Sequence, residues 1–159
     1  MNSRPSLLKM KIAFDQVNIS VSDVGTLIGG KVNYNINGLT PSQGQFQNAC
    51  AIRMSYALNS AGYKIPFMRG STVSGGKGNW YIYKVKALVD FLRNEFGEPD
   101  QTIENPTVEK LSKYRGILVV DVESWSDASG HATLWYGSRC SDECYFPLAK
   151  KAYLWKLED

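Results

Sequence analysis

The sequence predicts an α+β protein, with helices in its first two thirds and an antiparallel β-sheet in its last third. In three segments between residues 7 and 96, apolar residues recur at the 3.6-residue spacing of amphipathic helices. After residue 116 they form a continuous run and then an alternating run, and both patterns are typical of strands. With 159 residues, 43% of them hydrophobic, the chain can bury one sizeable core, so we expect a single domain over residues 1–159.

Two helices are expected in the first 62 residues. The first covers residues 7–17. The second begins near Cys50, where apolar residues return at helical spacing until Gly62 ends the pattern. Asn48 can cap this helix by accepting a backbone N–H two or three residues further on. The sequence therefore places Cys50 in the first turn of a helix.

Two more helices are expected before the sheet. The apolar residues of segment 82–96 follow helical spacing, and segment 105–116 opens on an Asn-Pro pair, which favours a helix start. Between the second and third helices, residues 69–79 are rich in glycine and serine and predict an exposed loop. This loop lacks the spacing and the hydroxyl residue of a phosphate-binding loop, so nucleotide binding is not expected.

Four extended segments predict the sheet. Segment 117–122 is a continuous apolar run, as in strands buried on both faces. In segment 131–136, successive side chains alternate between the two faces of a strand. Residues 144–146 and 152–157 can add two antiparallel strands. Because His131 begins its strand directly after a turn at 124–130, we expect it near the end of the sheet, where side chains can meet a cleft.

Cys50 and His131 are the candidate catalytic pair. Unpaired N–H groups and the dipole at a helix start favour a thiolate, and His131 is the only histidine available to partner it. A neighbouring imidazole can hold the thiolate in an ion pair and then protonate a leaving amine. The alternative is that Cys50 is a small buried apolar residue and His131 a hydrogen-bonded strand residue.

Such a pair needs a third group that orients the imidazole. Asp142 is the first candidate because it lies between Cys140 and Cys144, and a disulfide closing that loop would hold the carboxylate rigidly. Asp142 can also be an ordinary solvated loop carboxylate. Its rivals for the orienting role are Asp121, Asp127 and Glu143.

The cysteines allow two interpretations. A disulfide between Cys140 and Cys144 would imply an oxidising destination for the protein. Zinc is the competing interpretation, since these two cysteines with Cys50 and His131 make up a full Cys₃His ligand set. We favour the disulfide, because structural zinc sites bring their ligands as close pairs at both ends, whereas Cys50 and His131 stand alone in the sequence.

Composition and charge exclude several classes of function. Eighteen basic and fifteen acidic residues leave a dispersed net charge of +3, so no nucleic-acid partner is expected. No apolar run is long enough to cross a membrane, and the first twenty residues lack the pattern of a secretory signal. We therefore expect neither a membrane partner nor an ordinary export signal.

Four segments of the chain carry the motifs of a known family. They are NING at 35–38, FQNACAIRMS at 46–55, GHATLW at 130–135 and CSDEC at 140–144, with LIGG at 27–30 as a weaker match. Together they resemble the fourth family of type VI secretion amidase effectors, which are bacterial toxins with an NlpC-like, papain-related fold. In this fold, helices that include the nucleophile helix pack on an antiparallel sheet.

The resemblance implies an endopeptidase that hydrolyses the γ-D-glutamyl to meso-diaminopimelate bond of peptidoglycan stem peptides, with no cofactor and no metal. It implies that Cys50 is the nucleophile, His131 the general base and acid, Asp142 the orienting group, and Cys140 with Cys144 a disulfide. It also implies export by the type VI apparatus from a donor cytoplasm, action in the periplasm of a Gram-negative recipient, and a cognate immunity protein as partner.

Two other functions remain open. A papain-like acyltransferase uses the same cysteine–histidine pair but passes the acyl group to an amine instead of water. A non-enzymatic wall-binding module, stapled by a disulfide or by zinc, would use Cys50 and His131 as structural residues only. No family motif marks residues 147–159, so apart from the expected strand at 152–157 the sequence assigns the C-terminal segment no contact with substrate or partner.

Overall fold

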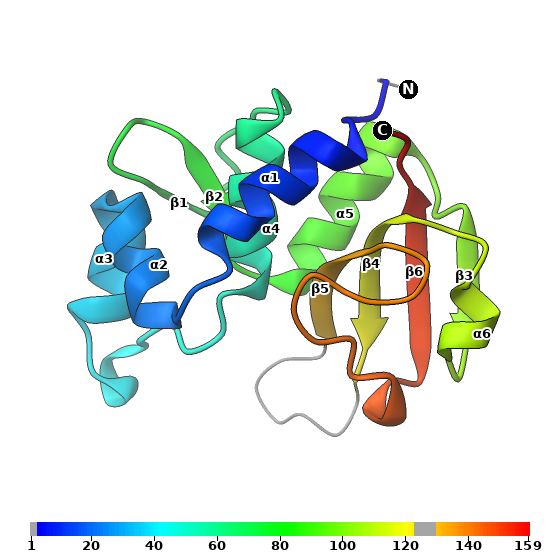
Figure 1. The fold of residues 1–159 in the computed structure, drawn as a ribbon. Coiled ribbons are helices and arrows are strands. Elements are labelled where there is room, and N and C mark those ends of the chain that lie inside the picture. The colour runs from blue at the N-terminus through cyan, green and yellow to red at the C-terminus, as the bar shows by residue number, and fades with distance from the viewer. Residues whose placement is uncertain (1–2, 123–129) are drawn as a thin grey trace.

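The protein has the predicted α+β architecture in a computed structural model that describes residues 3–122 and 130–159 (Figure 1). Most of the expected turn at 124–130, and the rival carboxylate Asp127, lie outside the described residues. The elements in chain order are α1 (Leu7–Val17), α2 (Val21–Ile28), α3 (Gly30–Asn37), the 3₁₀ helix η1 (Pro41–Gln43), α4 (Cys50–Ser60), β1 (Thr72–Ser74), β2 (Trp80–Ile82), α5 (Val85–Phe96), β3 (Gln101–Glu104), α6 (Val108–Leu111), β4 (Gly116–Asp121), β5 (Gly130–Trp135), the 3₁₀ helix η2 (Phe146–Leu148) and β6 (Lys151–Lys156).

The main sheet has four antiparallel strands in the order β3-β6-β4-β5. Strand β4 lies inside the sheet and is buried over residues 116–120, because it is covered on both faces. Strand β5 forms one edge, and His131 pairs with Val120 one residue from the end of their shared ladder. The predicted position of His131 near the end of the sheet is therefore confirmed.

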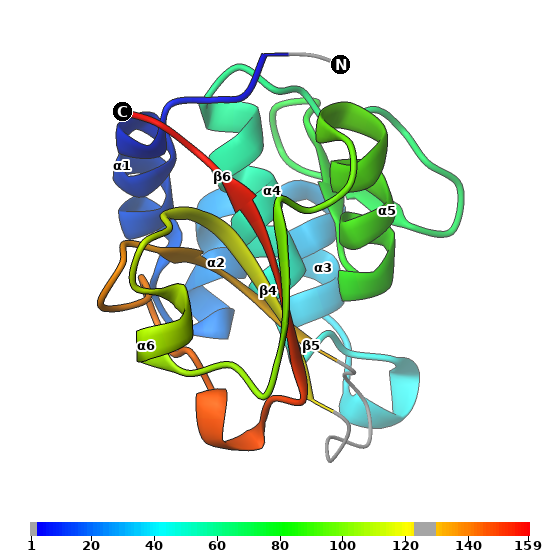
Figure 2. The same ribbon diagram turned by 90° about the vertical axis from the view of Figure 1, so that its right-hand side faces the viewer.

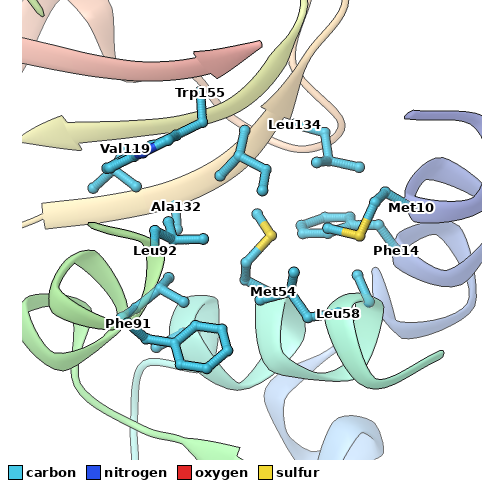
Figure 3. Close-up of a cluster of buried hydrophobic side chains, with 14 of the residues drawn as sticks. Met10, Phe14, Met54, Leu58, Phe91, Leu92, Val119, Ala132, Leu134 and Trp155 are labelled. Carbon is cyan, nitrogen blue, oxygen red and sulfur yellow. The ribbon is translucent and has the colours of Figure 1, made fainter. Parts of the chain in front are cut away.

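One face of this sheet packs on α1, α4 and α5 (Figure 2). Figure 3 shows how side chains from the three helices meet those of the sheet in one apolar cluster. Its labelled members are Met10, Phe14, Met54, Leu58, Phe91, Leu92, Val119, Ala132, Leu134 and Trp155. Because α4 enters this core along its length, the helix that carries Cys50 is held firmly against β5.

A second cluster covers the opposite face of the sheet and involves the C-terminal segment. Leu118 and Trp135 pack there with Ala149, and the indole Nε1 of Trp135 donates to the Leu111 carbonyl at 2.9 Å. The Cys140–Cys144 segment lies along the same face. Residues 147–159 thus complete the sheet, as expected from the strand at 152–157, and help to cover its outer face.

A smaller unit of α2, α3 and the β1–β2 hairpin packs beside α4 (Figure 1). Its tightest approach is at Gly30, which has a φ of +57° and lies against the backbone of the hairpin turn. A Cβ at Gly30 would sit 2.5 Å from the carbonyl carbon of Gly75. Glycine at position 30 is therefore required by this close contact between α3 and the hairpin.

Three predicted elements differ from the structure. The loop expected at 69–79 contains β1, which pairs with β2 and buries Val73. The third helix begins at Val85 instead of Ile82, since Ile82 belongs to β2. The short helix begins at Val108 with Thr107 as its cap, because Asn105 has a left-handed backbone with φ +49° and lies outside it.

One predicted strand is absent, and one observed strand was not predicted. The strand expected at 144–146 is absent: Tyr145 has φ +58°, which interrupts an extended run, and η2 follows it. Strand β3 was missed because its four residues include only one apolar side chain, Ile103, so alternation gives almost no signal. The bounds of α1 were predicted correctly, and β4, β5 and β6 each lie within one residue of prediction.

Candidate active site

Cys50 is the first residue of α4, as predicted. The amide oxygen of Asn48 accepts a hydrogen bond from the Cys50 backbone N–H at 3.0 Å, so Asn48 makes the expected bond, but Ala49 occupies the cap position. The Cys50 N–H is therefore not open to an oxyanion while Asn48 stays in place. The thiol is shielded, with 2% of the residue exposed, and Sγ lies 4.0 Å from the Gly130 carbonyl oxygen.

Two polar residues of α4 that the sequence analysis did not single out hold the helix start in place. The guanidinium of Arg53 donates to the carbonyls of Val17 at 3.2 Å and Ile19 at 2.7 Å, at the end of α1. The hydroxyl of Ser55 donates to Ala51 at 2.8 Å and accepts from the backbone N–H of Ile82 at 2.9 Å. Helix α4 is thus tied to α1 on one side and to β2 on the other.

His131 lies between a thiol and a carboxylate. Its Nε2 is 3.0 Å from Oδ1 of Asp142, and the Cys50 side chain is close enough to raise the pKa of the imidazole. Because Nε2 bonds Asp142, Nδ1 is the ring nitrogen left for the thiol. The ring of Tyr145 packs edge-on against the imidazole at 4.8 Å and further restricts its rotation. The structure therefore brings together all three residues that the sequence nominated.

The groups around His131 favour a charged imidazole. Burial alone lowers the pKa of His131, but the neighbouring Asp142 and Cys50 side chains outweigh it and raise the pKa from 6.5 to about 9. Burial raises the pKa of Asp142, because it disfavours the charged carboxylate. The hydrogen bond and charge of His131 act in the opposite direction and outweigh burial, so the pKa of Asp142 lies below its usual value. At neutral pH the arrangement thus holds an imidazolium between two acidic groups.

The loop that carries Asp142 is fixed from several directions. Cys140 and Cys144 form a disulfide with their Cα atoms 5.6 Å apart, as expected. The backbone N–H of Ser141 donates to Leu134 on β5 at 2.9 Å, and the side-chain amide of Asn18 donates to the Ser141 carbonyl at 3.1 Å. Asp142 therefore reaches His131 from a closed loop that is bonded to both β5 and the end of α1.

Other roles proposed for these residues find less support. The disulfide takes up Cys140 and Cys144, so they cannot supply the zinc ligands that the Cys₃His alternative requires. Among residues 3–122 and 130–159, no group of three or more His, Cys, Asp and Glu side chains could hold a metal ion. Within that same part of the chain, Asp142 is the carboxylate that hydrogen-bonds His131, ahead of Asp121 and Glu143.

A hollow of about 260 Å³ lies between α5 and the sheet and includes Gly130, the residue nearest the Cys50 sulfur among the contacts above. Its rim carries the cations Lys86 and Arg93 and the anions Asp90 and Asp121. The hollow therefore offers groups of both charges to a charged peptide. No helix in the described residues is both long and apolar enough to span a membrane.

The fold and the thiol–imidazole–carboxylate row at its sheet edge define the papain-like class of proteins. Within that class the chain belongs to the family of type VI secretion system amidase effector protein 4, whose family model matches residues 46–155. It is thus a type VI secretion amidase effector. No curated protein matches the sequence.

Solved structures of the same family are similar over nearly the full chain. The Tae4 effector of Salmonella Typhimurium, in complex with the immunity protein Tai4, is 43% identical, with a TM-score of 0.89 over 98% of this chain and 99% of that one. The Tae4 effector of Enterobacter cloacae is 37% identical, with a TM-score of 0.88 over 98% of both chains. The Salmonella typhimurium effector has also been crystallised with the Enterobacter cloacae Tai4, and that effector chain is 42% identical, with a TM-score of 0.89 over 97% of this chain and 99% of that one.

Proposed function

We propose that this effector is a cysteine endopeptidase that hydrolyses the γ-D-glutamyl to meso-diaminopimelate bond of peptidoglycan stem peptides. The observation that carries the proposal is the position of His131, which hydrogen-bonds Asp142 and lies close enough to the Cys50 thiol for it to raise the pKa of the imidazole. A thiolate beside an oriented imidazolium is the arrangement that nucleophilic attack on an amide requires. Membership of an amidase effector family supports the same chemistry.

Each of the three residues has a distinct role in the proposed reaction. The Cys50 thiolate attacks the γ-carbonyl carbon, and the C–N bond breaks as His131 Nδ1 gives its proton to the leaving amine. A water molecule then loses a proton to Nδ1 and hydrolyses the thioester, which restores the thiol. Asp142 keeps Nε2 protonated throughout, so that Nδ1 is the nitrogen that exchanges the proton.

The substrate carries charges that suit the hollow beside Gly130. A stem peptide has free carboxylates on both sides of the scissile bond and an ammonium group on diaminopimelate. Lys86 and Arg93 can attract the carboxylates, and Asp90 and Asp121 can attract the ammonium group. This mixed rim supports a charged peptide substrate over an apolar one.

Digestion of purified meso-diaminopimelate peptidoglycan, followed by mass spectrometry of the muropeptides, tests the proposal. We expect fragments that end in a free γ-D-glutamate and new amino-terminal diaminopimelate, and no fragments with the Cys50→Ala variant. A folded Cys50→Ala protein that still digests peptidoglycan would contradict the mechanism. Adding a competing amine distinguishes a transferase, because amide products would then replace the free acid.

We also propose that the protein acts in the periplasm of a recipient cell and is neutralised by an immunity protein of the Tai4 type. The Cys140–Cys144 disulfide suits an oxidising compartment, and related effectors are seen in complex with Tai4. The Enterobacter cloacae Tai4 is a suitable probe, since it binds an effector of another genus. Calorimetric titration should detect its binding, and wall digestion should fall as it saturates the protein.

A further inference from the structure

Thr133 lies two residues beyond His131 on β5, and its hydroxyl is completely buried without a hydrogen-bond partner. Within residues 3–122 and 130–159, it is the one buried side-chain oxygen or nitrogen atom that has no hydrogen-bond partner. An unpaired buried polar group costs about 1–3 kcal/mol, and native proteins contain few of them. The cost of this hydroxyl therefore calls for a functional reason.

The strand register places this hydroxyl beside Asp142, the carboxylate that bonds His131. Trp135 forms an antiparallel bridge with Cys140, and the next residue of the loop, Ser141, donates its N–H to Leu134 at 2.9 Å. Extending this register by one more pair of residues puts Thr133 opposite Asp142. Side chains directly opposite in an antiparallel pair have Cβ atoms about 5 Å apart on one face, within reach of a hydroxyl–carboxylate hydrogen bond.

The electrostatics of Asp142 agree with this placement. Burial raises the pKa of Asp142, the hydrogen bond and charge of His131 lower it, and the Thr133 hydroxyl lowers it further. The hydroxyl is therefore close enough to act on the carboxylate, although it falls short of full hydrogen-bond geometry. A small rotation about χ1 of Thr133 is enough to complete the bond.

We propose that Thr133 is a positioning residue of the active site, whose hydroxyl donates to the Asp142 carboxylate and holds it against His131. Strand β5 then carries both the imidazole and a donor that fixes the partner of that imidazole. The inference rests on the proposed cysteine peptidase function and deepens it, because it adds a fourth side chain to Cys50, His131 and Asp142.

Two substitutions separate the hydroxyl from the methyl group of Thr133. Thr133→Val keeps the shape and removes the hydroxyl, whereas Thr133→Ser keeps the hydroxyl and removes the methyl group. Activity is measured as kcat and KM on peptidoglycan across pH. A second readout needs no substrate: the rate at which iodoacetamide alkylates Cys50, the only free cysteine, as a function of pH.

We expect Thr133→Val to lower kcat about tenfold with KM unchanged, which is the effect of losing one hydrogen bond to a charged group. The pH profile of kcat should narrow at both limbs, whereas the alkylation rate should change only at its acid limb, because the thiolate stays reactive at high pH. The acid limb moves to higher pH because the pKa of Asp142 rises. The alkaline limb moves to lower pH because a carboxylate that is held less firmly raises the pKa of His131 by a smaller amount. Thr133→Ser should restore the wild-type profiles despite some loss of stability.

Two results would overturn the inference. In the first, Thr133→Val matches the wild type in kcat and in both pH profiles and is equally or more stable, as expected when an idle unpaired donor is removed. In the second, Thr133→Ser loses as much as Thr133→Val, which would assign the effect to the methyl group. If the wild type fails to digest peptidoglycan, the proposed function fails instead, while the alkylation profiles still decide the role of Thr133.

Discussion

Nε2 of His131 lies 3.0 Å from Oδ1 of Asp142. This bond joins the start of the edge strand β5 to a disulfide-closed loop eleven residues further along the chain. The bond accounts for most of the electrostatic character of the site. It keeps Asp142 ionised, it raises the pKa of His131, and it leaves the other ring nitrogen to Cys50. Most of the predictions below test a consequence of this contact.

Asp142→Asn should bring the pKa of His131 down from about 9 towards its ordinary value of 6.5, because the amide carries no charge. Turnover should fall about 10³–10⁴-fold, because the amide favours the wrong imidazole tautomer. An NMR titration of the ring protons measures the pKa without ambiguity, since His131 is the only histidine. An unchanged titration would assign the orienting role to another group.

The stability of the protein should depend on pH through the same pair. The raised pKa of His131 contributes about 3 kcal/mol, fully present below pH 6.5 and lost as the pH rises to about 9. The lowered pKa of Asp142 contributes stability that is lost as the pH falls below about 4. Urea unfolding of the wild type and Asp142→Asn should therefore differ most between pH 4 and 6.5 and converge above pH 9.

Opening the Cys140–Cys144 disulfide should reduce both stability and turnover. Closing so short a loop stabilises the folded state by about 2 kcal/mol on the chain-entropy model, and reduction also frees the loop that carries Asp142. The double variant Cys140→Ser, Cys144→Ser should lose this stability and show a lower kcat. A thiol count on the unfolded, unreduced wild type should give one, and a count of three would contradict the disulfide.

Lys86→Ala should weaken substrate binding with little effect on the chemical step. Loss of one exposed cation near a bound carboxylate raises KM by about threefold to tenfold, because solvent screens the interaction. Lys113→Ala is the matched control, since Lys113 is also exposed but lies outside this hollow. Equal KM values for the two variants would remove the hollow from the substrate path.

Gly30→Ala should destabilise the contact between α3 and the hairpin by about 3 kcal/mol or more. The added Cβ meets the backbone of Gly75, and φ is +57°. Gly44→Ala is the control, because Gly44 also has positive φ but open space around it, so only the backbone cost of about 1–2 kcal/mol applies. Chemical denaturation of both variants measures the difference, and equal losses would show that the close contact is unimportant.

Strong local patterns made much of the fold predictable. Segments such as 7–17 and 117–122 have clear helical or continuous apolar spacing, and the structure matches them to within one residue. Short elements were missed because they have little pattern of their own. Strand β1 forms only when it pairs with β2, and Tyr145 leaves the extended region where the disulfide loop turns.

The sequence by itself determined the parts of the site: one histidine, a cysteine at a helix start, and a carboxylate between two cysteines. Local spacing and residue chemistry decide such features, so they can be read without coordinates. Only the tertiary structure decided that Cys50, His131 and Asp142 meet. These contacts join segments far apart in the chain, and they depend on how α4 packs on β5 and how the disulfide loop is bonded back to that strand.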